Sequence, residues 1–113
     1  MNVYDEAHAL ARALKESPDY KGYMELKAKV SENDELSASI NDFQQKQFQL
    51  QAQQVLGGEP QVDMVEQMQN LYQILVKDPL AAQYLQAEFA FTRLVSDVYG
   101  ILGEVIKVGS YEE

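Results

Sequence analysis

Apolar residues recur along most of the chain at intervals of three and four, the spacing that places side chains on one face of an α-helix. This pattern predicts five helices, over about residues 2–16, 18–31 and 34–56, from Asp63 to the sequence KDP at 77–79, and from Pro79 to about Val108. No stretch alternates apolar and polar residues as a half-buried strand does. The predicted fold class is therefore all-α, an antiparallel helical bundle with long third and fifth helices.

Capping residues mark where several of these helices begin and end. A side chain that can accept a hydrogen bond from the first turn precedes three helices, at Ser17, Asn33 and Asp78. Pro18 and Pro79 follow two of these caps, at the first helical position, where a missing N–H costs nothing. Glycine tolerates the left-handed conformation that ends many helices, so the sequence GGEP from Gly57 is expected to terminate the third helix.

Seven glutamines fall between positions 44 and 54, a composition found in disordered tracts and also in helices. Apolar residues keep helical spacing through this tract and form one stripe made of Leu36, Ile40, Phe43 and Leu50. A second stripe lies on another side of the helix and comprises Phe48, Ala52 and Val55. We therefore predict an ordered helix whose two apolar stripes pack against neighbours on two sides.

The fifth helix carries the longest apolar pattern in the sequence. Its spacing alternates between four and three without a break, at Leu80, Tyr84, Ala87, Phe91, Leu94, Val98, Ile101, Val105 and Val108. A second row beside it widens the apolar arc beyond what a two-stranded coiled coil requires. We therefore predict self-association as a dimer or larger homo-oligomer, and docking on another protein. The candidate self-association or partner interface comprises Phe43, Phe48, Leu50, Val55, Tyr84, Phe91, Leu94, Val98, Ile101 and Val105.

Length and composition narrow the class of protein. The 113 residues predict one helical domain over 1–108 and a flexible tail over 109–113. A formal charge of −9 disfavours direct binding to nucleic acid or to anionic lipid. Cysteine is absent, which excludes disulfides and thiolate metal sites. The sequence lacks a signal-peptide pattern and an apolar run of membrane-spanning length, so we expect a cytoplasmic protein.

Few side chains are candidates for catalysis or metal binding. His8 is the single histidine, with Asp5 one turn before it, whereas metal sites in helical bundles need more ligands than this pair supplies. Glu88 falls at the edge of the apolar arc of the fifth helix, where it is expected to form a structural ion pair with Arg12, Arg93 or a lysine. We predict no catalytic residue, metal site or cofactor. The alternative is a protein that binds a small ligand or metal in an interhelical cleft, using Glu88 or His8.

Three stretches carry a family resemblance: YDEAHALARALKESPDYKGYMELKAKV, DFQQKQFQLQ and DPLAAQYLQAEFAFTRLVSDVYGIL. They contain an Asp-x-Ala first helix, a Ser-Pro-x-Tyr start to the second, a Phe-Gln-x-x-Gln centre and a Pro-x-x-x-x-Tyr-Leu-x-Ala-Glu opening of the last helix. In this order they resemble the YlbF/YmcA family of small helical proteins from Gram-positive bacteria, including its YheA-like branch. The likeness covers about Val3 to Lys107.

The resemblance implies a cytoplasmic, oligomerising helical protein without enzymatic activity of its own. The resemblance also implies a role like that of the better-studied members of the family. Those members regulate competence, sporulation and biofilm formation, and they act in a complex that assists ribonuclease Y in RNA maturation. Some members bind iron–sulfur clusters through cysteines near the C-terminus. This chain has no cysteine. Cluster binding is therefore not inherited, and the resemblance points to a cysteine-free branch.

Overall fold

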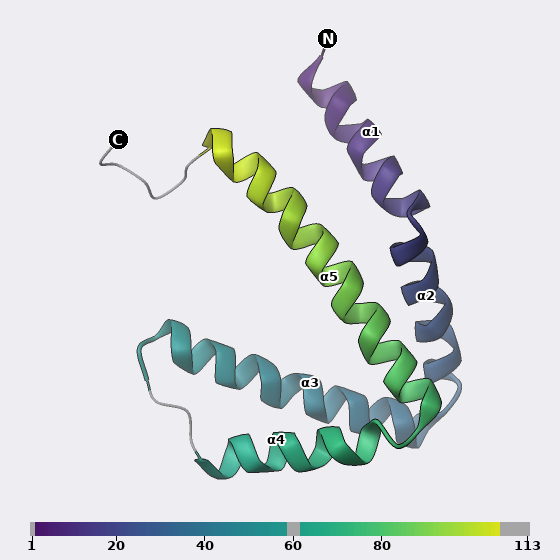
Figure 1. The fold of residues 1–113 in the computed structure, drawn as a ribbon, viewed down its shortest axis with the longest axis vertical. Coiled ribbons are helices and arrows are strands. Elements are labelled where there is room, and N and C mark those ends of the chain that lie inside the picture. Colours follow the sequence, from purple (N-terminus) through teal and green to yellow (C-terminus); the bar gives the residue numbers. More distant parts are fainter. Residues whose placement is uncertain (1, 59–61, 107–113) are drawn as a thin grey trace. The chain divides into compact units, whose positions relative to one another are not determined.

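The computed structural model describes residues 2–58 and 62–106. Over these ranges the chain forms five α-helices: α1 (Val3–Glu16), α2 (Pro18–Ser31), α3 (Asp34–Val55), α4 (Val62–Leu75) and α5 (Pro79–Ile106) (Figure 1). The described residues contain no strand. The predicted all-α class with five helices is confirmed, and the Gln-rich tract lies inside α3 as an ordered helix. The predicted tail over 109–113 lies outside the described residues.

The predicted caps set the starts of three helices. The side-chain oxygens of Ser17, Asn33 and Asp78 each accept a hydrogen bond from a backbone N–H of the following first turn, at 3.2, 3.0 and 2.9 Å respectively. These bonds satisfy N–H groups that have no partner within the helix. The helix starts could be predicted from the sequence because each cap acts on its own first turn.

The end of α3 is set by its glycine pair. Gly57 has a φ of 82°, in the left-handed region that side chains with a Cβ disfavour. Its N–H donates to the carbonyl of Gln54 at 3.1 Å, and the N–H of Gly58 donates to the carbonyl of Gln53 at 2.8 Å. This pair of bonds is a Schellman motif, which satisfies carbonyls left over at a helix end. The predicted terminator is confirmed.

The residues fall into two compact units. Among the described residues, the central unit comprises 25–58 and 62–85, and the terminal unit comprises 2–24 together with 86–106. The central unit therefore contains α3, α4, the end of α2 and the start of α5. The terminal unit contains α1, the start of α2 and most of α5. The single domain expected over 1–108 stays a prediction.

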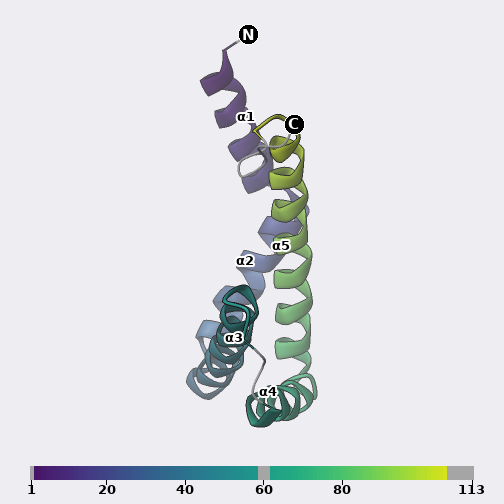
Figure 2. The same cartoon turned by 90° about the vertical axis from the view of Figure 1, so that its left-hand side faces the viewer.

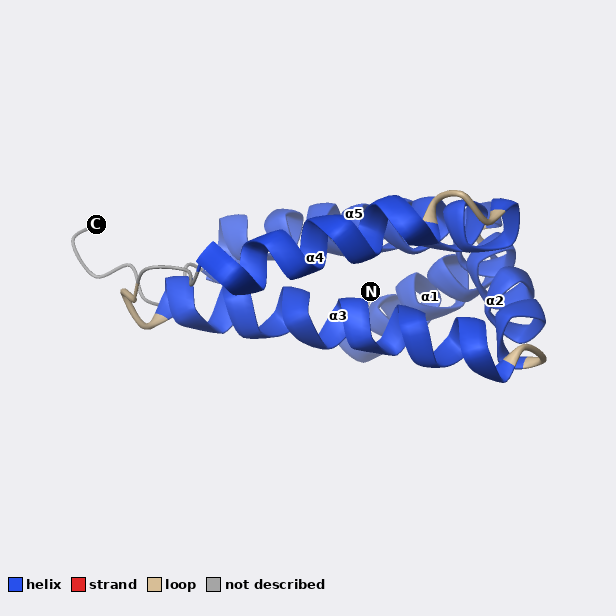
Figure 3. Ribbon diagram, turned by 90° about the horizontal axis from the view of Figure 1, so that it is seen from below, coloured by secondary structure: helices blue, strands red, loops and turns tan. Residues whose placement is uncertain are grey.

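The central unit is built around a pair of antiparallel helices. Figure 3 shows α3 and α4 running side by side. The rings of Phe43 and Tyr72 join them, with centroids 5.6 Å apart. Every described residue that is buried belongs to this unit: Val30, Leu36, Ile40, Phe43, Leu50, Leu75, Ala81 and Tyr84. The first apolar stripe of α3 is thus the centre of a core.

The terminal unit is held together differently. The start of α2 lies beside the middle of α5, as Figures 1 and 2 show. Tyr20 and Tyr23 both pack on Phe91, with ring centroids 5.4 and 5.7 Å away. These aromatic contacts are half-buried, and no described residue of the unit is fully buried. The terminal unit is therefore held together by an aromatic contact, whereas the central unit has a buried core.

Candidate interaction surfaces

Three of the predicted interface residues lie inside the central unit. Phe43, Leu50 and Tyr84 are only 8%, 7% and 5% exposed. They contribute to the core of the chain itself, so in this structure they offer almost no surface to another molecule. The sequence pattern assigned them correctly to apolar helix faces, while the folded chain covers those faces.

Two other predicted interface residues lie on the outer side of α3. Phe48 is 71% exposed and Val55 is 85% exposed, whereas Ala52 between them is half-buried. Phe48 lines a shallow depression of about 430 Å³ with the polar side chains of Asn41, Gln44, Gln45 and Gln49. The second apolar stripe of α3 is therefore mostly at the surface of the described structure.

The remaining predicted residues form a row along α5 that we call the α5 seam: Phe91, Leu94, Val98, Ile101 and Val105. Exposure increases along this row. The first three residues are half-buried, while Ile101 is 63% exposed and Val105 is 86% exposed. The aromatic contact with α2 covers the beginning of the seam, at Phe91. The C-terminal half of the seam is accessible to another molecule.

The terminal unit exposes further large apolar side chains. On the same stretch of α5, Tyr99, Leu102 and Ile106 are 69%, 43% and 58% exposed. On α1, Val3 and Tyr4 are 81% and 77% exposed. α1 also has no buried residue. The apolar side chains that the terminal unit leaves accessible are thus drawn from two helices.

The residues considered for catalysis or metal binding lie on different helices. His8 lies on the exposed surface of α1, and Glu88 is half-buried on α5. The predicted ion pair of Glu88 with Arg12, Arg93 or a lysine stays a prediction. Among residues 2–58 and 62–106, no group of three or more histidine and carboxylate side chains is placed to hold a metal ion.

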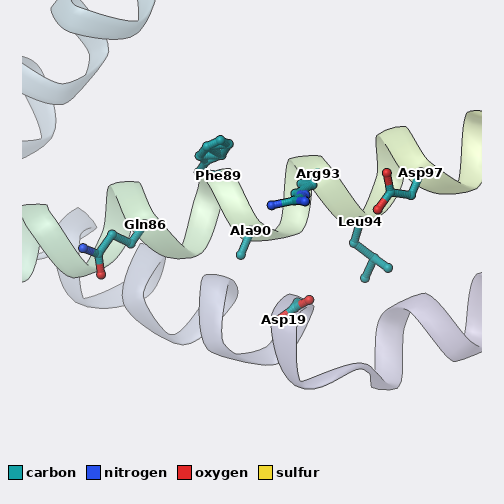
Figure 4. A pocket seen from close by; sticks show the side chains of 7 residues that line it. All are labelled: Asp19, Gln86, Phe89, Ala90, Arg93, Leu94 and Asp97. Atoms are coloured by element: carbon teal, nitrogen blue, oxygen red, sulfur yellow. The ribbon is translucent and has the colours of Figure 1, made fainter.

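A groove of about 440 Å³ lies between the start of α2 and α5 within the terminal unit (Figure 4). Ala90 and Leu94 point from α5 toward α2, and Asp19 faces them from the first turn of α2. The α5 wall carries Gln86, Phe89, Arg93 and Asp97. The groove thus combines an apolar floor with charged groups from two helices.

The sequence pattern alone did not reveal this groove. Asp19 and Asp97 are far apart along the chain, and only the packing of α2 against α5 brings them to one groove. One local signal was present. Phe89 is two positions from Phe91, or about 200° round the helix, so a large aromatic residue stands on the polar side of α5.

None of the helices, over the part of the chain that the structure describes, is both long and apolar enough to cross a membrane. The exposed apolar residues of α5 share their helix with Arg93, Asp97 and Glu104. Exposed apolar side chains bordered by charged residues are typical of surfaces that bind other molecules.

Comparison with known proteins identifies the family. The sequence model described as control of competence regulator ComK, YlbF/YmcA, matches residues 3–107. The chain belongs to the YlbF/YmcA family. The resemblance carried by the three sequence stretches is thereby confirmed, over the range from which it was inferred.

Relatives of the chain are similar over nearly their full lengths. A UPF0342 protein of Symbiobacterium thermophilum is 40% identical over 94% of this chain and 95% of its own. A UPF0342 protein of Caldicellulosiruptor bescii is 37% identical over 94% of this chain and 89% of its own. Among solved structures, a Bacillus stearothermophilus protein described as a protein of unknown function (DUF964) has a TM-score of 0.75. It covers 93% of this chain and 92% of its own at 16% identity, so it shows a shared fold.

The YlbF/YmcA match spans both compact units. It begins at the first residue of α1 and continues one residue beyond the last residue of α5. The buried core of the central unit and the accessible α5 seam both lie within the matched region. The features that distinguish the two units therefore belong to the part of the chain that defines the family.

Proposed function

We propose that this YlbF/YmcA-family chain is a non-enzymatic cytoplasmic regulatory protein that acts by binding other polypeptides, including a second copy of itself. The accessible half of the α5 seam carries the proposal. Ile101 and Val105 continue an apolar row whose earlier members are partly covered by the chain's own α2. The match to regulators of competence supports a regulatory role.

The size of the exposed surface favours an interface. From general side-chain areas, the five exposed apolar residues between Tyr99 and Ile106 leave roughly 250–450 Å² accessible. Patches of about 300–600 Å² are the largest on typical monomers and are often functional. Two copies that paired through this stretch alone would bury about 500–900 Å², below the roughly 1,200 Å² of a stable interface. Val3 and Tyr4 of α1 add enough area to approach that size, so we assign α1 to the interface as well.

The spacing of the α5 seam favours a helix as its partner. Phe91, Val98 and Val105 repeat every seven residues, and Leu94 and Ile101 fall between them, as in the a and d positions of a coiled coil. Val98 and Val105 at the first of these positions, with Leu94 at the second, match the residue choice that favours pairing with a second parallel helix. A second copy supplies a helix of the same spacing, and symmetric homodimers are the commonest oligomers.

Family membership supports a proposal for the pathway. We propose that the chain contributes to the control of competence, sporulation or biofilm formation, and that it modulates RNA processing through ribonuclease Y. If so, affinity capture of the tagged chain from its native host recovers ribonuclease Y or its accessory proteins. Capture that recovers none of them contradicts the RNA-processing role and leaves self-association to its own test.

Self-association is tested by sedimentation velocity over a range of protein concentrations. The wild-type chain is expected to form a dimer or larger species, and Ile101→Glu combined with Val105→Glu is expected to give a monomer. The matched control is Gln69→Glu combined with Gln73→Glu, which adds the same charge at exposed positions of α4. Circular dichroism verifies that each variant is still helical.

Two results contradict the proposal. One is a wild-type chain that stays monomeric at every concentration. The other is a seam variant that associates as strongly as the α4 control, because two buried carboxylates cost far more than the seam contacts gain.

A further inference from the structure

Phe89 is the starting point for a second contact surface. Its side chain is 65% exposed, and it lies about 180° round the helix from Val98 of the α5 seam. A phenylalanine in this position contributes neither to the core of the central unit nor to the seam. Arg93 follows it by one turn, and both residue types are enriched at the centres of protein interfaces. The polar side of α5 therefore carries an anchor of the kind used to bind another protein.

The groove beside Phe89 has the length of a short helix. Its α5 wall runs from Gln86 to Asp97, about 16 Å or three turns at 1.5 Å per residue. Ala90 and Leu94 form an apolar floor facing α2 (Figure 4). A helix lying in such a groove presents apolar side chains at intervals of three and four.

The charged groups of the groove are available to a ligand. Asp19, Arg93 and Asp97 are all exposed, and within residues 2–58 and 62–106 none of the three forms an ion pair. Asp19 lies on the α2 side, while Arg93 and Asp97 lie on α5. Figure 4 shows Asp19 across the groove from Arg93, with Asp97 one turn further along α5. Two carboxylates and one guanidinium are complementary to a segment with more basic than acidic side chains.

We propose that this groove is a docking site for an amphipathic helical segment of a protein partner, with one apolar residue on the floor at Leu94, another on Phe89 at the rim, and basic residues at Asp19 and Asp97. The inference rests on the proposed function, since it names a second surface by which the chain binds polypeptides. The formal charge of −9 attracts a basic segment during encounter. Phe89 lies about 160° round α5 from Val105 and about 24 Å along it, and Leu94 precedes the accessible half of the seam. Docking in the groove therefore leaves Ile101 and Val105 accessible for self-association.

The charge pattern is tested by selecting binders from a phage-displayed library of helical peptides against the full chain. The wild-type chain is expected to enrich peptides with an apolar residue flanked by lysine or arginine. Asp19→Lys combined with Asp97→Lys is expected to abolish that enrichment or to turn it toward acidic peptides. The matched control is Asp63→Lys combined with Glu66→Lys on α4, which makes the same change in net charge. Asp63, like Asp19, lies in the first turn of its helix. The control is expected to retain the basic enrichment.

The anchor is tested with the most enriched peptide in a fluorescence anisotropy titration. Phe89→Ser is expected to weaken binding about tenfold or more, as truncation of a central aromatic anchor does. Sedimentation velocity on the same samples is expected to show unchanged self-association. The docking proposal is overturned if no peptide is enriched, if enrichment survives charge reversal in the groove, or if Phe89→Ser binds as the wild type. A wild-type chain that does not self-associate contradicts the proposed function, whatever the outcome of the peptide experiments.

Discussion

The central and terminal units are built from the same kind of amphipathic helix but bury it to different extents. In the central unit, Ile40 on α3 is 2% exposed and Leu75 on α4 is 2% exposed. In the terminal unit, Ile101 on α5 is 63% exposed. The apolar spacing of the two regions is similar, so the difference comes from the neighbours that each helix meets.

This difference shows that helix formation and core formation have separate causes in the chain. Both Asn2 and Asn33 cap their helices, and both α1 and α3 extend over their predicted ranges. Only α3 has an antiparallel neighbour along its length. Since most helical stability in proteins comes from packing of the apolar face, the terminal unit is expected to depend on a second molecule for stability.

The largest expected effect is seen in a matched pair of isoleucine substitutions. Ile40→Ala is expected to lower the free energy of unfolding by about 2–5 kcal/mol, because it removes buried carbon and leaves a cavity. Ile101→Ala is expected to change it by less than about 0.5 kcal/mol at concentrations where the chain is monomeric. Urea denaturation followed by circular dichroism measures both. An equal loss from the two substitutions contradicts the contrast between the units.

A smaller effect is expected from the two asparagine caps. Asn33 accepts a hydrogen bond from the N–H of Leu36 at 3.0 Å, and Asn2 accepts one from the N–H of Tyr4 at 2.8 Å. Asn33→Ala is expected to destabilise the chain by about 1 kcal/mol, the usual value of a cap. Asn2→Ala is expected to leave the main unfolding transition unchanged and to speed amide exchange within α1. If Asn2→Ala shifts the main transition as much as Asn33→Ala, then α1 unfolds together with the core.

Effects of opposite sign, similar in size to those of the caps, are expected from two glycines. Gly57→Ala is expected to cost about 1–2 kcal/mol of unfolding free energy, because the φ of 82° is strained for alanine. Gly103→Ala is expected to stabilise the end of α5 by up to about 1 kcal/mol, since an added Cβ there has no atom within 4 Å. Thermal unfolding measures the first, and amide exchange in α5 measures the second. If both substitutions stabilise the chain, or both destabilise it, the different roles given to these two glycines are contradicted.

The sequence was sufficient to predict what is decided locally. Ser17, Asn33, Asp78 and Gly57 each act within one turn, so the helix ends could be inferred from single residues and their neighbours. The ordered state of the Gln-rich tract followed from spacing that continues through it. Family membership followed from motifs that extend along the whole matched region.

The sequence was not sufficient to predict which apolar faces the chain covers. Phe43 and Phe48 lie on the same helix and were both assigned to an interface, yet one is 8% exposed and the other 71%. Periodicity specifies which residues share a face, whereas burial depends on whether another helix reaches that face. The groove also depends on packing between helices. The contact of Tyr20 and Tyr23 with Phe91 places Asp19 beside the α5 wall.

Amide hydrogen exchange at several protein concentrations tests most directly whether the terminal unit depends on a second copy. The comparison is between residues 98–106 of α5 and residues 36–50 of α3, from a concentration at which sedimentation shows monomer to one at which it shows the associated species. Protection of the α5 segment is expected to rise with concentration, while protection of the α3 segment stays high and constant. An α5 segment that is protected as strongly as α3 in the monomer, with no dependence on concentration, would contradict the account.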